Sequence, residues 1–329
     1  MALSKLSADE HGIILGQLCN PLEPLPAWYF SSANSGLRLL LTPALRHQLR
    51  VDHLSAAAFC RKAGMRSCKE LREATLVEWH FKSLASADWA TLGSLGLVVP
   101  VLERLAILES PESVAVLGYH SRCHMQCLAA GLCAGALQAV TYFACNFVHV
   151  GDAGASALAA ALGLGALPQL KELYLGNAGI GDAGLVALAP ALRRRPALER
   201  LILWRNPFGD EGIAALVAPS PPAGALQPPA GALAELRELD LEDSQVSDAG
   251  CAVLAAALDS GAMPALGCLE LGGIPASAAA KAAVQAALDI NLEHNESGSE
   301  SEEDNEEDDE AEGEGEEEGC DCDACAGLL

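Results

Sequence analysis

A segment of about thirty residues recurs along the second half of the chain, and it constrains the fold more than any other feature. Its marker is a run of five residues, in which an apolar residue is followed by Gly or Ser, then Asp, then any residue, and finally Gly. The final glycines of the four markers are Gly154, Gly184, Gly212 and Gly250. These glycines lie 30, 28 and 38 residues apart. A repeat of this length is typical of a solenoid, in which each unit buries its apolar face against its neighbours.

Each unit contains an apolar triplet and an alanine-rich stretch. The triplet has the spacing L-x-x-L-x-L, whose alternation indicates a strand with one buried side. A Gly-Asp turn then leads into Ala and Leu at helical spacing, and the aspartate suits the N-terminus of that helix. We therefore predict a strand, a turn and a helix in every unit. The triplets begin at Val140, Leu170, Leu198, Leu236 and Leu266.

This pattern resembles the leucine-rich repeats of the ribonuclease-inhibitor type over residues 140–288. The resemblance implies an α/β solenoid, a horseshoe arc with parallel strands inside and helices outside. Because an asparagine ladder normally satisfies the turn backbone of such repeats, its near absence here predicts a less regular stack. One unit carries Asn206 at the asparagine position, and the others carry Val148, Ala178, Ser244 and Ile274.

Fainter repeat units extend upstream of residue 137, and with them the chain divides into an N-terminal part, a repeat part and a tail. The triplets Leu71, Ala74, Leu76 and Leu102, Leu105, Ile107 fit the strand spacing. The proline-rich stretch after Ala218 predicts a projecting loop. We expect a helical N-terminal cap over residues 1–66, a solenoid over 67–290 that is regular from about 137, and a disordered acidic tail over 291–329.

The N-terminal part does not repeat, and its pattern predicts three helices. Ser7 and Glu10 form a capping box that starts a helix at about Ala8. A second helix is expected from about Gly36 to Leu49 with a kink at Pro43. A third is expected over residues 54–62.

The same part resembles an F-box, a helical module that links a substrate receptor to a ubiquitin ligase through an adaptor. The resemblance rests on Leu6, Ser7, Asp9, Glu10, Ile13, Ile14 and Leu18, then on a proline-rich break and Ser31 to Arg38. The tryptophan-bearing end of that module is missing. Two interpretations stay open, an F-box or a cap that shields the first repeat.

The net charge of −24 belongs mostly to the tail, because residues 291–329 hold 18 acids and no Lys or Arg. Such a segment is self-repelling and predicts disorder, and it either attracts a basic protein or only keeps the chain in solution. Ser297, Ser299 and Ser301 each have an acid three residues on, which predicts phosphorylation by acidophilic kinases. The absence of a basic stripe argues against binding to nucleic acid or anionic membranes.

Twelve cysteines without a signal sequence predict reduced thiols and a cytoplasmic or nuclear protein. No paired C-x-x-C knuckles occur, so we predict no metal and no cofactor. Catalytic motifs are also missing, which predicts that the chain is not an enzyme. The candidate metal ligands considered are His120, Cys123, His124, Cys127, Cys133, Cys320, Cys322 and Cys325.

Residues between the strand leucines face the concave side of such an arc. Trp, Tyr and Arg are frequent interface anchors, and Trp204 stands at a predicted exposed position. We therefore predict a monomeric, non-enzymatic scaffold that binds a protein partner on the concave face. The predicted contact residues are Tyr142, Phe147, Tyr174, Asn177, Arg200, Trp204, Arg205, Asp240, Glu242 and Asp243.

Two other functions remain open. The first is an F-box-type substrate receptor of a ubiquitin ligase that uses residues 6–50. The second is a regulator similar to the Ran GTPase-activating proteins, because an acidic tail after ribonuclease-inhibitor-type repeats resembles that family. No residue here matches the catalytic arginine of that family.

Overall fold

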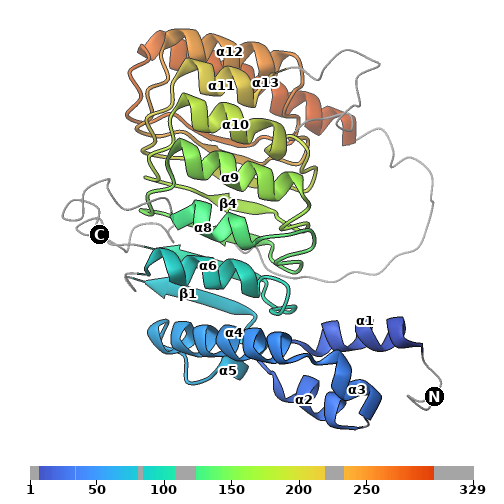
Figure 1. Cartoon of the computed structure of the whole chain (residues 1–329). Helices are drawn as coiled ribbons and strands as arrows, with labels where there is room; N and C mark the ends of the chain where they lie inside the picture. The colour runs from blue at the N-terminus through green and yellow to red at the C-terminus, as the bar shows by residue number, and fades with distance from the viewer. Residues whose placement is uncertain (1–6, 34, 81–83, 109–123, 219–232, 300–329) are drawn as a thin grey trace, which may run out of the picture.

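Seven parallel strands form one sheet in chain order, and one or more helices return beside it between strands (Figure 1). The computed structural model describes residues 7–33, 35–80, 84–108, 124–218 and 233–299. This architecture confirms the predicted leucine-rich-repeat solenoid. The strands are β1 (Leu76–His80), β2 (Arg104–Leu108), β3 (Tyr142–Ala144), β4 (Glu172–Tyr174), β5 (Arg200–Ile202), β6 (Glu238–Asp240) and β7 (Cys268–Glu270).

The helices fall into an N-terminal group and a group that lines the outer side of the sheet. The N-terminal helices are α1 (Ala8–Leu18), α2 (Leu25–Ser32), α3 (Ser35–Leu40), α4 (Pro43–Lys62) and α5 (Cys68–Glu73). The outer helices are α6 (Ser86–Leu95), α8 (His124–Gly131), α9 (Gly151–Gly163), α10 (Asp182–Leu192), α11 (Asp210–Leu216), α12 (Asp248–Asp259) and α13 (Ala278–Ser299).

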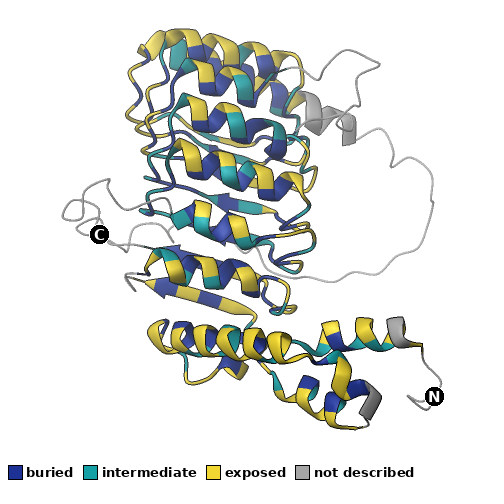
Figure 2. Cartoon of the chain, in the orientation of Figure 1, coloured by how far each residue is buried: buried dark blue, intermediate teal, exposed yellow. Residues whose placement is uncertain are grey.

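The core lies between the sheet and the outer helices, where the buried residues gather (Figure 2). Phe143, Leu173, Leu201 and Leu239 hold the same position in successive strands and pair with one another across the sheet. All four side chains are fully buried. Burial of one such side chain contributes about 2 kcal/mol, so the triplets hold neighbouring units together.

The aspartates of the Gly-Asp turns also connect the units, but not as predicted. Asp182 Oδ1 accepts hydrogen bonds from the backbone N–H groups of Gly209 and Gly212, at 2.8 and 2.7 Å. The N-terminus of α10 has no side-chain cap of its own. Each carboxylate therefore caps the helix of the following unit, because at the first helical position it points along the solenoid. Asp152 and Asp210 make the same pair of bonds to the next unit, and Asp248 makes one of them, to Ser277.

The last glycine of each marker completes this contact. A Cβ on Gly184 would lie 2.6 Å from Asp152 Oδ1, and a Cβ on Gly250 would lie 2.4 Å from Asp210 Oδ1. Any larger residue would push the carboxylate away from the backbone groups that it binds. The marker therefore encodes a contact between two units, with the aspartate in one and the glycine in the next.

The asparagine position behaves differently from unit to unit. Asn206 is buried and accepts from the N–H groups of Ala178 and Ile180 at 3.1 and 2.9 Å. Its amide donates to the carbonyls of Leu175 and Leu203. At the equivalent position, the buried Ser244 hydroxyl has no hydrogen-bond partner among the described residues. Asn206 thus satisfies turn backbone groups at one junction, whereas the aspartates satisfy the N–H groups at the helix starts of successive units.

The N-terminal helices agree with the prediction only at α1. Its capping box is confirmed, with Glu10 N donating to Ser7 Oγ and Ser7 N donating to Glu10 Oε2. The predicted kinked helix through Pro43 is wrong, because Pro43 starts α4, where a missing N–H costs nothing, and Thr42 Oγ1 accepts from Leu45 N. The predicted third helix is part of α4. Prolines predicted to interrupt the chain instead open α2.

The predicted first strand is displaced by three residues. Leu71 lies in α5, and Leu76 is 51% exposed. The strand instead buries Val77 and Trp79, and Val77 pairs with Leu105. The Ser67 side chain caps α5 and takes residues 68–73 into that helix, so the triplet spacing there is accidental.

Two predicted segments fall largely outside the described residues, the proline-rich loop over 219–232 and the tail from 300 onward. Helix α13 continues to Ser299, past the predicted start of the tail at 291. Ser297 and Ser299 lie at the end of this helix, and Ser301 lies beyond the described part.

Candidate partner-binding surface

The parallel register sets the strand side chains that point away from the helices in rows on the concave face, where Ala106, Ala144 and Ile202 are buried by their neighbours. Residues that directly precede the buried strand leucines form the first row, in the order Arg104, Tyr142, Glu172, Arg200 and Glu238. The second row follows those leucines and contains Ala106, Ala144, Tyr174, Ile202, Asp240 and Glu270. The structure thus brings four of the predicted contact residues, Tyr142, Tyr174, Arg200 and Asp240, onto one face.

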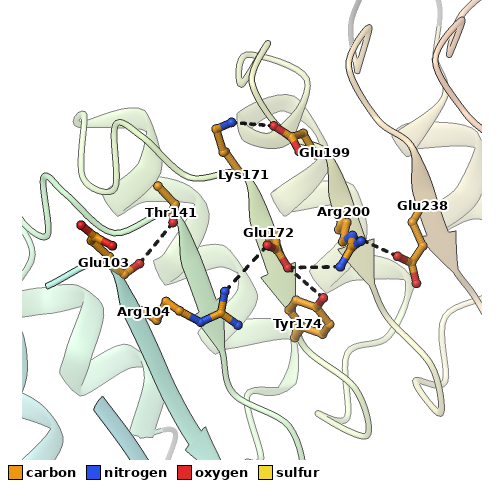
Figure 3. Close-up of polar contacts among 9 residues, drawn as sticks. All are labelled: Glu103, Arg104, Thr141, Lys171, Glu172, Tyr174, Glu199, Arg200 and Glu238. Carbon is orange, nitrogen blue, oxygen red and sulfur yellow. Dashed lines mark hydrogen bonds and ion pairs between the residues drawn. The ribbon is translucent and has the colours of Figure 1, made fainter. Parts of the chain in front are cut away.

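Alternating charges pair along the first row (Figure 3). Glu172 lies between two arginines, with Oε1 4.0 Å from Arg104 Nη1 and Oε2 3.7 Å from Arg200 Nη1. Arg200 Nε also lies 3.2 Å from Glu238 Oε2. The basic groups at this end are therefore already occupied by acids of neighbouring strands.

The two tyrosines complete this part of the surface. Their rings lie 4.9 Å apart, and the Arg104 guanidinium sits 3.8 Å from the centre of the Tyr142 ring. Burial raises the pKa of Tyr174 to about 12, so its hydroxyl keeps the proton that it donates to Glu172 Oε2 at 2.9 Å. The pair offers a half-buried aromatic surface held in place by fixed ion pairs.

Trp204 is more buried than predicted. A Cβ on Gly176 would lie 2.3 Å from Trp204 Cε2, so the indole lies across the space that this glycine leaves. The Phe147 ring meets it edge-on at 5.2 Å. The exposure predicted for Trp204 is therefore wrong. Because Gly176 of the preceding unit has no side chain, the indole packs against that unit and is half-buried.

Six predicted residues lie in the turns after the strands rather than on the strands, and Trp204 and Glu242 are two of them. Phe147, Asn177, Arg205 and Asp243 hold equivalent positions and share a left-handed backbone, with φ of 60°, 49°, 53° and 52°. Arg205 Nε lies 2.9 Å from Asp243 Oδ2. Together with four further residues, three of these side chains line a pocket of about 440 Å³ beside the concave face. The further residues are His149, Gly179, Pro207 and Gln245, and Asn206 forms part of its wall.

The C-terminal end of the concave face is acidic. Burial raises the pKa of Asp240 to about 6, and repulsion by Glu242, Glu270 and Glu238 adds to the effect. The Glu242 carboxylate makes no hydrogen bond or ion pair to any residue of the described ranges. Among the described residues, the Glu270 carboxylate accepts a hydrogen bond only from the Cys268 thiol, at 3.6 Å. Asp240, Glu242 and Glu270 therefore keep a negative potential that no ion pair within the described ranges offsets.

Sequence reasoning missed Arg104, Glu172, Glu238 and Glu270. The first three stand at the same repeat position as Tyr142 and Arg200, so the triplet spacing alone contained the signal to find them. Glu270 stands at the position of Tyr174 and Asp240 in the last strand.

The candidate metal ligands do not gather within the part of the chain that the structure describes, where no three His, Cys, Asp or Glu side chains are placed to hold an ion. His124 instead stacks on Trp89, with ring centres 5.6 Å apart, and burial lowers its pKa. Cys127 and Cys133 are free thiols. His120, Cys123 and the three tail cysteines lie outside the described residues.

Across the described ranges no helix combines the length and apolarity needed to cross a membrane.

Comparison with known proteins identifies the repeat. A family model described as Leucine Rich repeat matches residues 167–189 and 235–255, which contain β4 and β6 with their turns and the first parts of α10 and α12. No curated protein matches the chain.

Two solved structures are similar to parts of the chain. One is the Leiomodin-1 actin-binding site 2, with 16% identity over 48% of this chain and 86% of that chain and a TM-score of 0.36. The other is an internalin (inlF) from Listeria monocytogenes, with 14% identity over 59% of this chain and 48% of that chain and a TM-score of 0.30.

Proposed function

We propose that this chain is a non-enzymatic scaffold that binds a basic segment of a protein partner on the concave face. The observation that carries the proposal is the uncompensated acidic end of that face. Over β5 to β7, Arg200 and Arg205 are paired with Glu238 and Asp243. Asp240, Glu242 and Glu270 have no ion pair to a base among the described residues.

The proposed contact joins charge to aromatic surface. Lysine or arginine side chains of the partner would pair with Glu242 and Glu270, and their pairing would relieve the repulsion that raises the pKa of Asp240. The open edge of Trp204 beside Phe147 adds apolar area at the same end. Charge complementarity of this kind speeds association and selects between partners.

The test is affinity purification of partners with the full chain and with a double variant, Glu242→Lys with Glu270→Lys. We expect the variant to lose the specific partners, or to bind an isolated one at least about tenfold more weakly. Asp259→Lys is the matched control, because this exposed acid lies on α12, away from the concave face. An unchanged partner set in the double variant would refute the proposal.

A second candidate function has its own observation. The N-terminal helices expose large apolar side chains, with Ile13 66%, Tyr29 70% and Leu39 78% exposed. An F-box-type receptor would use such a surface to bind the ligase adaptor. The test is co-purification of the adaptor with the full chain and with Ile13→Asp and Leu39→Asp. Leu164→Asp, on an equally exposed solenoid residue, is the control, and no adaptor in any sample would end this candidate.

The Ran-regulator alternative stays a prediction. Among the described residues, no arginine matches the catalytic arginine of that family. GTP hydrolysis by Ran, measured with and without the chain, tests it directly, and we expect equal rates.

A further inference from the structure

A second surface lies among the N-terminal helices, at the end of the molecule opposite β7 (Figure 1). It is an apolar groove lined by residues of α2, of α4 and of the segment before α2. The groove has a volume of about 570 Å³. Leu22, Leu25 and Trp28 supply its apolar lining, and Leu25 and Trp28 remain 58% and 42% exposed. Large apolar side chains that stay exposed together on a folded domain indicate an interaction surface.

The rim of the groove is basic. Arg50 lines it and makes no hydrogen bond or ion pair to any residue that the structure describes. His53 lies beside it, and the one acid of the lining, Glu23, is already paired with Arg72. Helix α4 as a whole carries a charge of +3, from Arg46, Arg50, Arg61 and Lys62 against Asp52. A fitting occupant combines apolar side chains with carboxylates.

The chain itself contains a segment with this chemistry. Residues 300–329 hold 16 Asp and Glu and no Lys or Arg. Within them, Asp321 and Asp323 are followed closely by Leu328 and Leu329. Two leucines a few residues from two carboxylates match a groove with an apolar floor and an unpaired arginine at its rim.

The segment is long enough to reach the groove. Helix α13 ends at Ser299 beyond the last strand, and thirty further residues span up to about 100 Å when extended. The sheet between the two ends is only about 29 Å wide, from strand spacings of about 4.8 Å. Tethering holds the segment near the groove at an effective concentration in the millimolar range, so a weak contact suffices.

We propose that residues 300–329 fold back along the solenoid and place Leu328 and Leu329 in the groove between α2 and α4, with Asp321 and Asp323 near Arg50. This contact goes beyond the proposed concave-face function. It covers the exposed apolar residues of the N-terminal helices until a partner displaces the segment.

Hydrogen–deuterium exchange of the full chain and of a chain ending at Ser299 tests the contact. At low salt we expect residues 22–32 and 46–54 to exchange several-fold more slowly in the full chain. Arg50→Glu and, separately, Leu328→Ser with Leu329→Ser should abolish that protection. Arg38→Glu, an equally basic and exposed position on α3 outside the groove, should preserve it.

Equal exchange in the two chains would overturn the proposal, as would equal effects of Arg50→Glu and Arg38→Glu. Protection that increases with protein concentration would also overturn it, because the segment of a second copy would then fill the groove. Circular dichroism of each variant confirms that the fold is intact, so a loss of protection reports the contact and not unfolding.

Discussion

Two rows of acidic side chains run along this solenoid, and they do opposite things. On the turn side, Asp152, Asp182 and Asp210 each give one oxygen to two backbone N–H groups of the next unit. On the concave face, Glu242 and Glu270 accept no backbone hydrogen bond from a neighbouring unit among the described residues. The first row therefore stabilises the stack, and the second is free to meet a partner.

The difference shows that charge alone does not identify a binding surface. A carboxylate that caps a helix has its lone pairs satisfied and its charge offset by the helix dipole. On the concave face no helix terminus of the described ranges offsets the charge, and at Asp240 burial, with repulsion from neighbouring acids added, raises the pKa of the carboxyl. Substitutions in the two rows should separate folding from binding.

The largest effect on stability is expected at Asn206, the other polar side chain that links units. Asn206→Ala leaves two buried N–H groups and two carbonyls without partners, which should lower the free energy of unfolding by about 3 kcal/mol or more. Ser244→Ala, at the equivalent position with an unpartnered hydroxyl, should change it by less than about 0.5 kcal/mol. Urea unfolding of both variants measures the contrast, and equal losses would contradict the assignment.

Asp182→Ala should have the next largest effect. The N–H groups of Gly209 and Gly212 lose a charged acceptor at the start of α11, which should cost about 2 kcal/mol. Asp259→Ala, which removes an acid from the end of α12, should cost less than about 0.5 kcal/mol. Thermal or urea unfolding distinguishes the two, and partner binding should survive in both.

Asp240→Asn tests the concave row through pH. Because the folded-state pKa of about 6 lies above the unfolded value, the folded chain keeps a proton between about pH 4 and pH 6 that the unfolded chain loses. Stability should therefore fall as pH rises through this window, by about 1 kcal/mol after screening at a partly exposed site. The Asn variant should lack this fall and be the more stable protein at pH 7. A parallel pH dependence in the two proteins would contradict the assignment.

The smallest effect on stability is expected for Glu242→Lys with Glu270→Lys. These substitutions remove like-charge repulsion and break only the weak, exposed hydrogen bond from the Cys268 thiol to Glu270, so the free energy of unfolding should rise or stay within about 0.5 kcal/mol. Urea unfolding beside the binding assay provides the check. A large loss of stability would show that Glu242 and Glu270 stabilise the fold, as the turn-side aspartates do.

Local spacing was enough to predict the strands and helices of the regular units, because each triplet and each alanine-rich stretch carries its own period. The connections between units were not predictable in this way. Asp182 looks like a cap for its own helix until the turn of the next unit is in place, and Trp204 looks exposed until Gly176 leaves room beneath it. On the candidate surface, spacing identified Tyr142 and Arg200 but did not reveal that Glu172 joins them to Arg104.

The most direct test of the account is an NMR titration of the chain ending at Ser299 with a lysine- and arginine-rich peptide. Removal of residues 300–329 takes away the acidic segment that would compete for the peptide. The account predicts shift changes centred on residues 238–243 and 268–270, with the amides bonded to Asp152, Asp182 and Asp210 unaffected. Changes confined to the turn-side row, or none at β6 and β7, would contradict it.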